Sequence, residues 1–342
     1  MSGPFDDWLD GFRVRAGAED VPGLAALAGV TPLPEVVEKD RVQAEFTLPA
    51  RDYLARTVTA GRIAAGRAKL AAHAPLFQRI TATYGLPAPL LAAIWGVETA
   101  FGTNRGSTPT LAALATLAAE GRRRTLFEAE LRAFLWLAER EGFDPRTLTG
   151  SWAGATGHMQ FMPSTALAHA VDLDGDGRPD LWHDDPADAL ASAAAYLASG
   201  GWAADKPCLT RAAWVTGDPS LIAPAGAAGP VFRPGANWRA LARYNASDLY
   251  GLSVVTLAQA LAGDPWSIDW PETDRPLTRE TVARLQATLS AQGFAAGAPD
   301  GRIGPQTRSG LKSWQRANGL IPDGHPGPEV LARLAPEKQP EK

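Results

Sequence analysis

The sequence predicts a mainly α-helical protein that has a small irregular insert and a small three-helix module near its carboxyl end. Apolar residues recur at three- and four-residue spacing through much of the first 265 positions, which is the period of an amphipathic helix. Many of these runs end at glycine or begin with proline, as helices commonly do. A short internal repeat follows near residue 300 and predicts the separate module.

Size and composition support a folded protein of more than one domain. A chain of 342 residues exceeds one ordinary hydrophobic core. Its 45% hydrophobic and 20% charged residues are typical of globular proteins. No window reaches the length of a transmembrane helix, so we expect no membrane span. No heptad pattern or long exposed apolar face stands out, and we therefore expect a monomer.

Charge is distributed unevenly along the chain. The net charge of −4 argues against a nucleic acid partner. Residues 275–342 carry a net charge of +4, which leaves about −8 for the rest of the chain. A mildly basic module at the carboxyl end would be attracted weakly to an anionic matrix. Cys208 is the single cysteine, so neither an intrachain disulfide nor a thiolate metal cluster can form. We interpret it as a small buried hydrophobe.

Several stretches of the chain have the apolar period of a helix, and in the first of them Pro75 and Gly85 interrupt or end the helical pattern. The predicted helical stretches are residues 50–85, 110–121, 125–142 and 186–202. Between about Ala203 and Trp238 the pattern breaks into short segments rich in proline and glycine. We expect a small irregular or strand-containing insert there.

The carboxyl-terminal part contains a linker followed by the repeat. Gly263–Thr278 has three prolines and no helical period. Beyond it, "DGRIGPQTRSGL" (Asp300–Leu311) and "DGHPGPEVLARL" (Asp323–Leu334) match at Asp, Gly, Gly, Pro and Leu, and start 23 residues apart. Each copy predicts a turn that leads into a short helix. The predicted regions are 1–265, a linker at 266–277, a module at 278–336 and a polar tail at 337–342.

A single carboxylate stands out in "LLAAIWGVETAFG" (Leu90–Gly102). The apolar spacing predicts a helix over this run, with Phe101 on the apolar stripe. Glu98 lies four residues after Ile94 and three before Phe101, so it falls on the same stripe. Most glutamates on helices are solvated surface groups, and that alternative remains open from this window alone.

Two further stretches, together with Glu98, carry a resemblance. They are "GSWAGATGHMQFMPSTA" (Gly150–Ala166) and "ARYNASDLYG" (Ala242–Gly251). With "WGVETAFG", they resemble the lytic murein transglycosylase B family of the lysozyme-like superfamily, in the family's order and approximate spacing, over roughly residues 5–265. The repeat, with "RLQATLSAQGF" and "LKSWQRANGL", resembles the peptidoglycan-binding domain type 1 over residues 278–335.

The resemblance implies a lysozyme-like catalytic domain that cleaves the β-1,4 bond between N-acetylmuramic acid and N-acetylglucosamine in peptidoglycan. Glu98 would protonate the leaving oxygen and then accept the proton of the muramic acid 6-hydroxyl, which leaves a 1,6-anhydro end and consumes no water. An apolar setting would raise the pKa of Glu98 and favour this acid role. Most glycosidases use a second carboxylate; Asp248 is the nearest candidate, and we interpret it as solvated.

The same resemblance implies roles for further residues. Ser151 and Gln160 match positions that contact the sugars near the acid, and Phe161 would pack the floor of the groove. Tyr244 and Asn245 match a pair that helps to hold the acid and the departing sugars; without the resemblance, they would be a packed tyrosine and a capping asparagine. His158 either contacts substrate or is structural, which is commoner for a lone histidine near a loop.

An acidic loop in "DLDGDGRPDLWHDDPADAL" (Asp172–Leu190) begins like a calcium-binding EF-hand loop. Carboxylates at alternating positions would suit a hard cation, but Pro179 and His183 depart from the pattern. The resembling family closes a variant loop with a later aspartate, and Asp188 matches that location, while Asp180 is a further candidate. The expected ligands of a structural Ca²⁺ are therefore Asp172, Asp174, Asp176 and Asp188. The alternative is an acidic turn that binds no ion.

The leading hypothesis is an enzyme, a lytic transglycosylase whose peptidoglycan-binding domain keeps it on glycan strands. The chemistry needs no cofactor. One alternative is a muramidase that uses water, and another is an inactive peptidoglycan-binding scaffold. Because peptidoglycan lies outside the cytoplasm, we expect a periplasmic protein whose signal segment is not part of this sequence.

Overall fold

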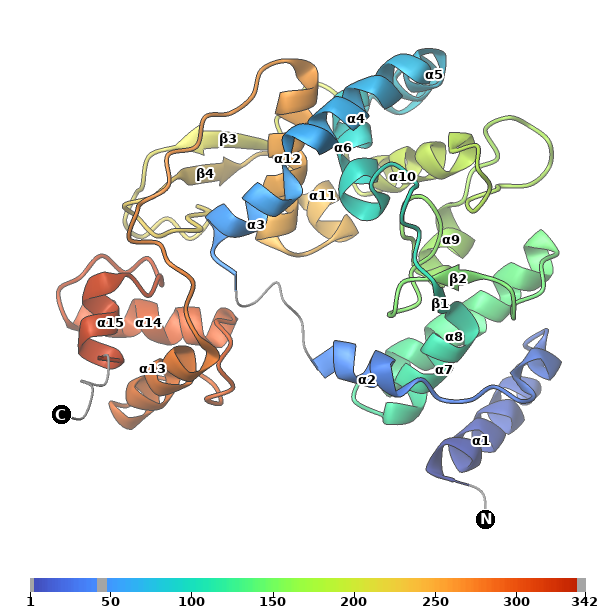
Figure 1. Cartoon of the computed structure of the whole chain (residues 1–342), viewed down its shortest axis with the longest axis horizontal. Helices are drawn as coiled ribbons and strands as arrows, with labels where there is room; N and C mark the ends of the chain where they lie inside the picture. The colour runs from blue at the N-terminus through green and yellow to red at the C-terminus, as the bar shows by residue number, and fades with distance from the viewer. Residues whose placement is uncertain (1–2, 42–47, 337–342) are drawn as a thin grey trace. The chain divides into compact units, whose positions relative to one another are not determined.

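The computed structural model describes residues 3–41 and 48–336, and the predicted polar tail 337–342 lies outside them. Within these residues the protein is mainly α-helical, as predicted, with four short strands (Figure 1). The contacts between Cα atoms divide the chain into two compact units. The first unit comprises 1–43 and 61–204, and the second comprises 44–60 and 205–342.

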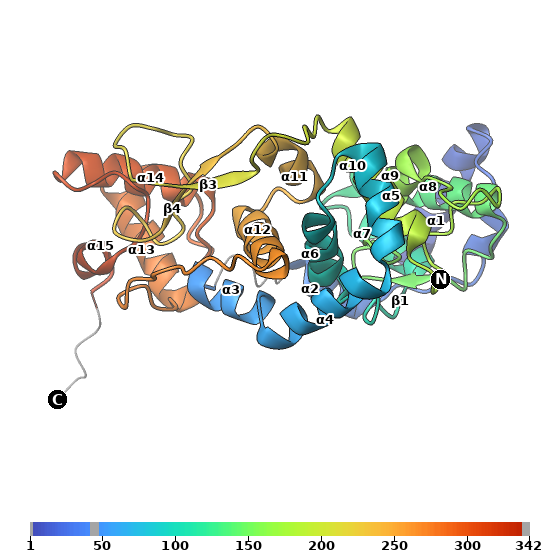
Figure 2. The ribbon, with the colours of Figure 1, turned by 90° about the horizontal axis from the view of Figure 1, so that it is seen from above.

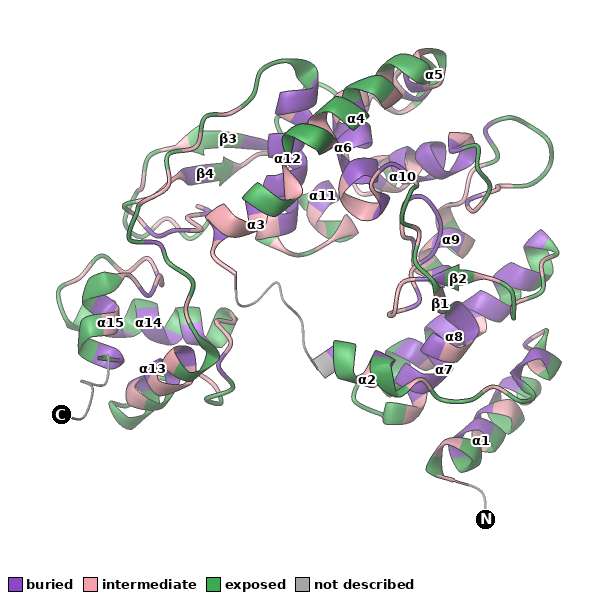
Figure 3. Ribbon diagram, in the orientation of Figure 1, coloured by how far each residue is buried: buried purple, intermediate pink, exposed green. Residues whose placement is uncertain are grey.

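The first unit has its main apolar core where helices α7 and α8 meet α1 and α2. Figure 3 shows buried residues along both α7 and α8, and their core includes Phe12, Leu114, Leu131 and Phe134. The helices of this unit are α1 (Pro4–Ala18), the 3₁₀ helix η1 (Leu24–Leu27), α2 (Pro34–Arg41), α4 (Ala60–Ala72), α5 (Ala74–Tyr84), α6 (Ala88–Thr99), α7 (Thr110–Glu120), α8 (Arg124–Glu141), α9 (Pro163–His169) and α10 (Ala187–Ser199).

The predicted helix ends are confirmed at three glycines. Gly85, Gly121 and Gly142 follow α5, α7 and α8 and have φ of 69°, 85° and 70°. Glycine tolerates this left-handed conformation, which closes a helix, better than residues with a Cβ do. Pro75 lies in the first turn of α5, where its missing N–H costs nothing.

A two-stranded sheet lies beside this helical core. Strands β1 (Thr108–Pro109) and β2 (Thr149–Gly150) pair antiparallel, and isolated bridges continue from Gly150 to Thr156 and from Thr156 to Phe161. Gly106 leads into β1 with φ of 91°, and a Cβ there would lie 2.1 Å from the carbonyl of Gly150. Only glycine allows the backbone at position 106 to lie this close to Gly150. This contact fixes the position at which the Gly150–Phe161 segment begins.

The second unit contains the predicted insert. Strands β3 (Leu209–Ala212) and β4 (Val231–Pro234) form an antiparallel pair within the stretch where strands were expected. Helix α12 (Asp248–Ala262) is largely buried and packs against α3 (Ala50–Thr57) and α11 (Trp238–Tyr244) (Figure 2). Cys208 is buried beside β3, in agreement with its interpretation as a small hydrophobe, and burial raises the pKa of its thiol to about 12.

The repeat forms the predicted three-helix module. Helices α13 (Arg279–Ala291), α14 (Pro305–Ala317) and α15 (Pro328–Leu334) share a core that includes Leu285, Leu311, Trp314 and Val330. The stretch 263–278 before it has neither helix nor strand. The division at residues 265 and 278 stays a prediction.

Among the described residues, no single helix is both long enough and apolar enough to cross a membrane. Helices α5 and α6 pass that test only as a pair, with a bend of 111° between them.

Candidate active site

Glu98 is the penultimate residue of α6 and is half-buried, while most residues of this helix are fully buried. The helix ends at Thr99 because Ala100 and Phe101 take left-handed conformations, with φ of 48° and 60°. The expectation that Phe101 continues the helical stripe is therefore wrong. Its ring folds back onto Gly96, where a Cβ would lie 2.6 Å from the ring.

The end of α6 is held by side chains that bond to distant backbone. The Thr99 hydroxyl donates to the His158 carbonyl oxygen at 2.7 Å and accepts from the Gly102 N–H at 3.0 Å. The buried Trp95 indole, one turn before Glu98, donates to Nδ1 of His158 at 3.3 Å. Glu98 thus stands on a helix end that tertiary contacts hold in place.

Ser151, Gln160 and Phe161 lie in the segment that follows β2. The Ser151 hydroxyl oxygen accepts from the Ala155 N–H at 3.1 Å, and its own N–H donates to the Ala155 carbonyl at 2.7 Å. Gln160 has a φ of 50°, which is unusual for a residue with a Cβ. Its amide nitrogen donates to the Arg105 and Gly157 carbonyls at 3.1 and 3.0 Å.

Phe161 is 4% exposed, and its ring meets Tyr196 edge-on with the centroids 5.8 Å apart. This burial agrees with a packing position. The half-buried Ser151 and Gln160 are partly open to solvent. The first unit thus holds Glu98 together with Ser151, Gln160 and Phe161.

Tyr244 and Asn245 belong to the second unit. Tyr244 is the last residue of α11, and its ring stacks parallel to that of Tyr250, with the centroids 6.5 Å apart. The side-chain oxygen of Asn245 accepts from the Ser247 N–H at 2.9 Å, so the asparagine does shape the turn before α12. Asp248 follows at the first turn of α12 and is exposed. The substrate roles of Tyr244 and Asn245 stay predictions.

His158 is 4% exposed and bonded through both ring nitrogens. Nδ1 accepts from Trp95, and Nε2 lies 2.6 Å from the His183 carbonyl oxygen, to which it donates. Burial lowers the pKa of His158, although the bond to His183 partly opposes this, so the ring is neutral near pH 7. A Cβ on Gly102 would lie 2.5 Å from Nδ1. Both ring nitrogens are thus occupied, which argues against a direct contact of His158 with substrate.

The acidic loop brings three of its four predicted ligands together. Carboxylate oxygens of Asp172, Asp174 and Asp176 lie within 4.8 Å of one another. Asp172 accepts the N–H groups of Gly175 and Gly177 at 2.7 and 2.8 Å, and these bonds lower its pKa. The loop therefore holds negative charge at neutral pH, and a cation would fit the oxygen cluster.

Asp188 lies in the first turn of α10, as expected, but outside the group of three. It is 3% exposed, and its two oxygens accept the Leu173 and Asp180 N–H groups at 2.7 and 2.9 Å. Burial raises the pKa of Asp188, with repulsion from Asp174 as a further cause in the same direction. Its contacts tie the two sides of the loop together. Asp180 itself pairs with the imidazole of His183 at 3.1 Å.

The sequence interpretation missed Arg105. Its guanidinium donates to the Trp182 and His183 carbonyls at 2.7 and 3.0 Å and pairs with Asp184 at 3.0 Å. Arg105 stands alone in the polar run "GTNRGS". No period or motif marks it, and only the fold brings it to residues almost eighty positions later.

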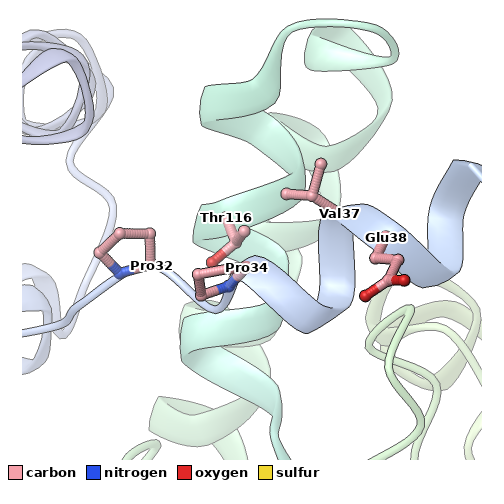
Figure 4. A pocket seen from close by; sticks show the side chains of 5 residues that line it. All are labelled: Pro32, Pro34, Val37, Glu38 and Thr116. Carbon is pink, nitrogen blue, oxygen red and sulfur yellow. The ribbon is translucent and has the colours of Figure 1, made fainter.

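A separate cavity of about 440 Å³ opens between α2 and α7 (Figure 4). It is lined by Pro32, Pro34, Val37, Glu38 and Thr116. None of the predicted site residues contributes to it, and its lining contains a single ionisable group. We assign it no part in catalysis.

Comparison with known proteins adds two family matches. Residues 4–218 match the family model of the transglycosylase SLT domain. Residues 278–334 match that of a peptidoglycan binding domain. The chain is also 48% identical over 120 residues to the membrane-bound lytic murein transglycosylase B of Escherichia coli K12. That alignment covers 35% of this chain, and it spans about a third (33%) of the E. coli protein's length.

Two solved structures extend the similarity. SltB3 from Pseudomonas aeruginosa, in complex with NAG-anhNAM-pentapeptide, is 37% identical, with a TM-score of 0.87 over 96% of this chain and 99% of that chain. The E. coli lytic transglycosylase Slt35, in complex with calcium, is 27% identical, with a TM-score of 0.66 over 77% and 95% of the two chains. The predicted lysozyme-like fold is confirmed by these similarities.

Proposed function

The chain belongs to the transglycosylase SLT domain family and carries a peptidoglycan-binding domain, and from this premise we propose that Glu98 is the single acid and base of its reaction. The protein is a lytic transglycosylase, and its proposed substrate bond is the β-1,4 link between N-acetylmuramic acid and N-acetylglucosamine. The observation that carries the assignment is the position of Glu98, half-buried at the end of an otherwise apolar helix.

The proposed reaction requires a carboxyl group that holds a proton when the substrate binds. Apolar surroundings disfavour the charged form, and the carbonyl groups at the end of a helix add a negative potential. Glu98 gives its proton to the glycosidic oxygen as the bond from C1 to that oxygen breaks. The 6-hydroxyl of the muramic acid then bonds to C1 and returns its proton to Glu98. The products are a free 4-hydroxyl and a 1,6-anhydro end.

Ser151 and Gln160 supply polar groups for the sugars in this proposal. The Ser151 oxygen already accepts one backbone N–H, while its hydroxyl proton can be donated to a sugar oxygen. Gln160 is held in a left-handed conformation by two bonds from its amide nitrogen, and such strained residues are frequent at functional sites. Phe161, which is buried against Tyr196, is proposed to pack the floor of the groove. Tyr244 and Asn245, which belong to the second unit, stay proposed substrate-binding residues on the resemblance alone.

The acidic loop is proposed to bind a structural Ca²⁺ through Asp172, Asp174 and Asp176. Support comes from the cluster of carboxylate oxygens and from the relative that was solved with calcium. Asp188 would act by closing the loop, or as a fourth ligand after a change in its hydrogen bonds. Added CaCl₂ should raise the thermal midpoint of the wild type but not of Asp174→Asn, with MgCl₂ as the control. An equal response of both proteins would contradict the proposal.

We further propose that the protein acts as a monomer in the periplasm, where its substrate lies. The peptidoglycan-binding domain would keep the enzyme on its insoluble substrate and so raise the local concentration of glycan.

The decisive experiment is mass spectrometry of the products that the wild type and Glu98→Gln release from purified peptidoglycan. We expect anhydro-ended products from the wild type and none from Glu98→Gln, since the amide cannot donate the proton. Glu139→Gln, a substitution of an exposed glutamate on α8, is the matched control and should stay active. Reducing ends from the wild type would instead favour the muramidase. No products, with binding intact, would favour the scaffold.

A further inference from the structure

Two side chains connect the end of α6 with residues 182–184 of the acidic loop, and each of these connections is called a bridge below. One is the imidazole of His158, which is bonded to Trp95 on the helix and to the His183 carbonyl. The other is Arg105, which holds the Trp182 and His183 carbonyls from the turn after α6. Both bridges lie within the first unit.

The two bridges meet at the same carbonyl, that of His183. Nε2 of His158 and the Arg105 guanidinium both reach it, at 2.6 and 3.0 Å. Arg105 also accepts from Gln160 through its own carbonyl, so the bridges extend to a proposed sugar-binding residue. The His158 backbone carbonyl accepts from Thr99, the residue next to Glu98.

The neutral imidazole is the form that this geometry requires. Trp95 donates to Nδ1, so that nitrogen must carry a lone pair. Nε2 lies 2.6 Å from the His183 carbonyl oxygen, which can only accept, so Nε2 must carry the hydrogen. Few residues offer a donor and an acceptor at this separation. Gly102 provides the space, because any Cβ there would overlap the ring.

We propose that His158 and Arg105 are positioning residues for Glu98, a role that rests on the proposed function. They hold the last turn of α6 against the 182–184 segment and thereby fix where the Glu98 carboxyl stands relative to the glycosidic oxygen. Neither side chain takes part in proton transfer. Loss of either bridge should lower kcat and leave KM nearly unchanged, because a small displacement of the acid costs rate more than binding.

The test uses variants of both bridges in the full chain. His158→Ala and Arg105→Met should each lower kcat by about 10- to 100-fold with KM within about two-fold. His158→Gln should recover part of the rate, because its amide N–H can still donate to the His183 carbonyl. Arg146→Met is the matched control, since Arg146 also holds two backbone carbonyls, those of Ala25 and Ala26, and should keep full activity.

A second readout does not depend on activity. In protein labelled with ¹³C at glutamate carboxyl carbons, the Glu98 signal is assigned by its loss in Glu98→Gln. Its chemical shift and pH titration midpoint should both change in His158→Ala and Arg105→Met, because the surroundings of the carboxyl change as the helix end loosens, and should stay unchanged in Arg146→Met. A merely structural role would change thermal stability alone.

The proposal is overturned if folded His158→Ala and Arg105→Met keep the wild-type kcat and Glu98 titration, or if Arg146→Met loses as much. Should His158→Ala not fold, Arg105→Met against Arg146→Met provides the same comparison. If the wild type itself makes no anhydro product, the proposed function fails, while the carboxyl titration still decides whether these residues position Glu98.

Discussion

The two copies of the Asp-Gly repeat have the same local structure but different surroundings. In the first, Gln286 on α13 donates to Asp300 at 3.0 Å and accepts from the Gly301 N–H at 2.9 Å. In the second, Gln315 on α14 donates to Asp323 at 2.7 Å and accepts from the Gly324 N–H at 2.8 Å. Both glycines have a φ of 74°.

The copies differ in what their remaining groups contact. The bonds of Asp300 use one oxygen, which accepts from Gln286 and from the Arg302 N–H. Asp323 uses both oxygens, because the second accepts from the Ala227 N–H at 2.8 Å, in the insert between β3 and β4. His325, at the position of Arg302, lies 3.6 Å from Asp274 of the stretch before the module.

The comparison shows that a repeated motif determines the local structure of a turn but not the contacts that the turn makes with the rest of the protein. The buried glutamine and the Asp-Gly pair build the same bonds twice within the module. Among the described residues, the second turn also bonds to backbone outside the module, at Ala227. Three predictions test this distinction, and they are ordered by the size of the expected effect.

The largest effect is expected when the glutamine is lost. Gln286→Leu and Gln315→Leu should each lower the free energy of unfolding of the module by about 2–4 kcal/mol, because the N–H groups of the buried Gly301 and Gly324 lose their acceptor and the aspartates lose a donor. Urea titration of the full chain, followed by amide hydrogen exchange in α13–α15, measures this. Similar losses in both variants would support equal turns, while a loss in one alone would show that the copies differ locally.

A smaller effect should separate the copies. In Asp323→Asn, the remaining side-chain oxygen can stay with Gln315, and the new amide N–H group then faces the N–H of Ala227. We therefore expect the free energy of unfolding to fall by about 1–2 kcal/mol and hydrogen exchange at Ala227 to become faster. Asp300→Asn keeps its single bonded oxygen and is the matched control, with a smaller loss. Equal losses and unchanged exchange at Ala227 would mean that the contact with the insert contributes nothing.

The smallest effect concerns pH. Burial lowers the pKa of His325 to about 4; Asp323 opposes this shift and Arg308 adds to it. The unfolded histidine, with a pKa near 6.5, binds the proton more readily, so stability is complete above pH 6.5 and is lost as the pH falls toward 4. Between pH 7 and 6 we expect a loss below about 1 kcal/mol that His325→Gln removes. A wild-type stability independent of pH over this range would contradict the assignment.

Much of the helical structure could be predicted because its signals are local. The ends of α5, α7 and α8 each depend on one glycine that follows a periodic run. The end of α6 was missed because it depends on the Phe101 ring turning back onto Gly96, which the apolar period does not distinguish from continuation of the helix. The apolar period indicates only which residues are buried. Phe101 is buried because the chain turns back on α6, and not because the helix continues.

The candidate site shows the same limit. Glu98, Ser151 and Gln160 could be named because a resemblance marked them. The partners of His158 come from residues 63 positions before it and 25 after it, and those of Arg105 lie 77 to 79 positions later. Asp188 matched its expected place, but its oxygens bond to loop N–H groups, which composition could not indicate.

The sequence by itself determined the helix periods, the glycine-terminated ends and the two Asp-Gly turns, because each depends on residues within about twenty positions of one another. Only the tertiary structure decided which turn bonds to the insert, across the 96 positions between Ala227 and Asp323, and which side chains hold the end of α6. The physical reason is that a hydrogen bond between distant segments needs both to be placed by their own packing first. The sequence around either partner does not indicate which distant residue it will bond to.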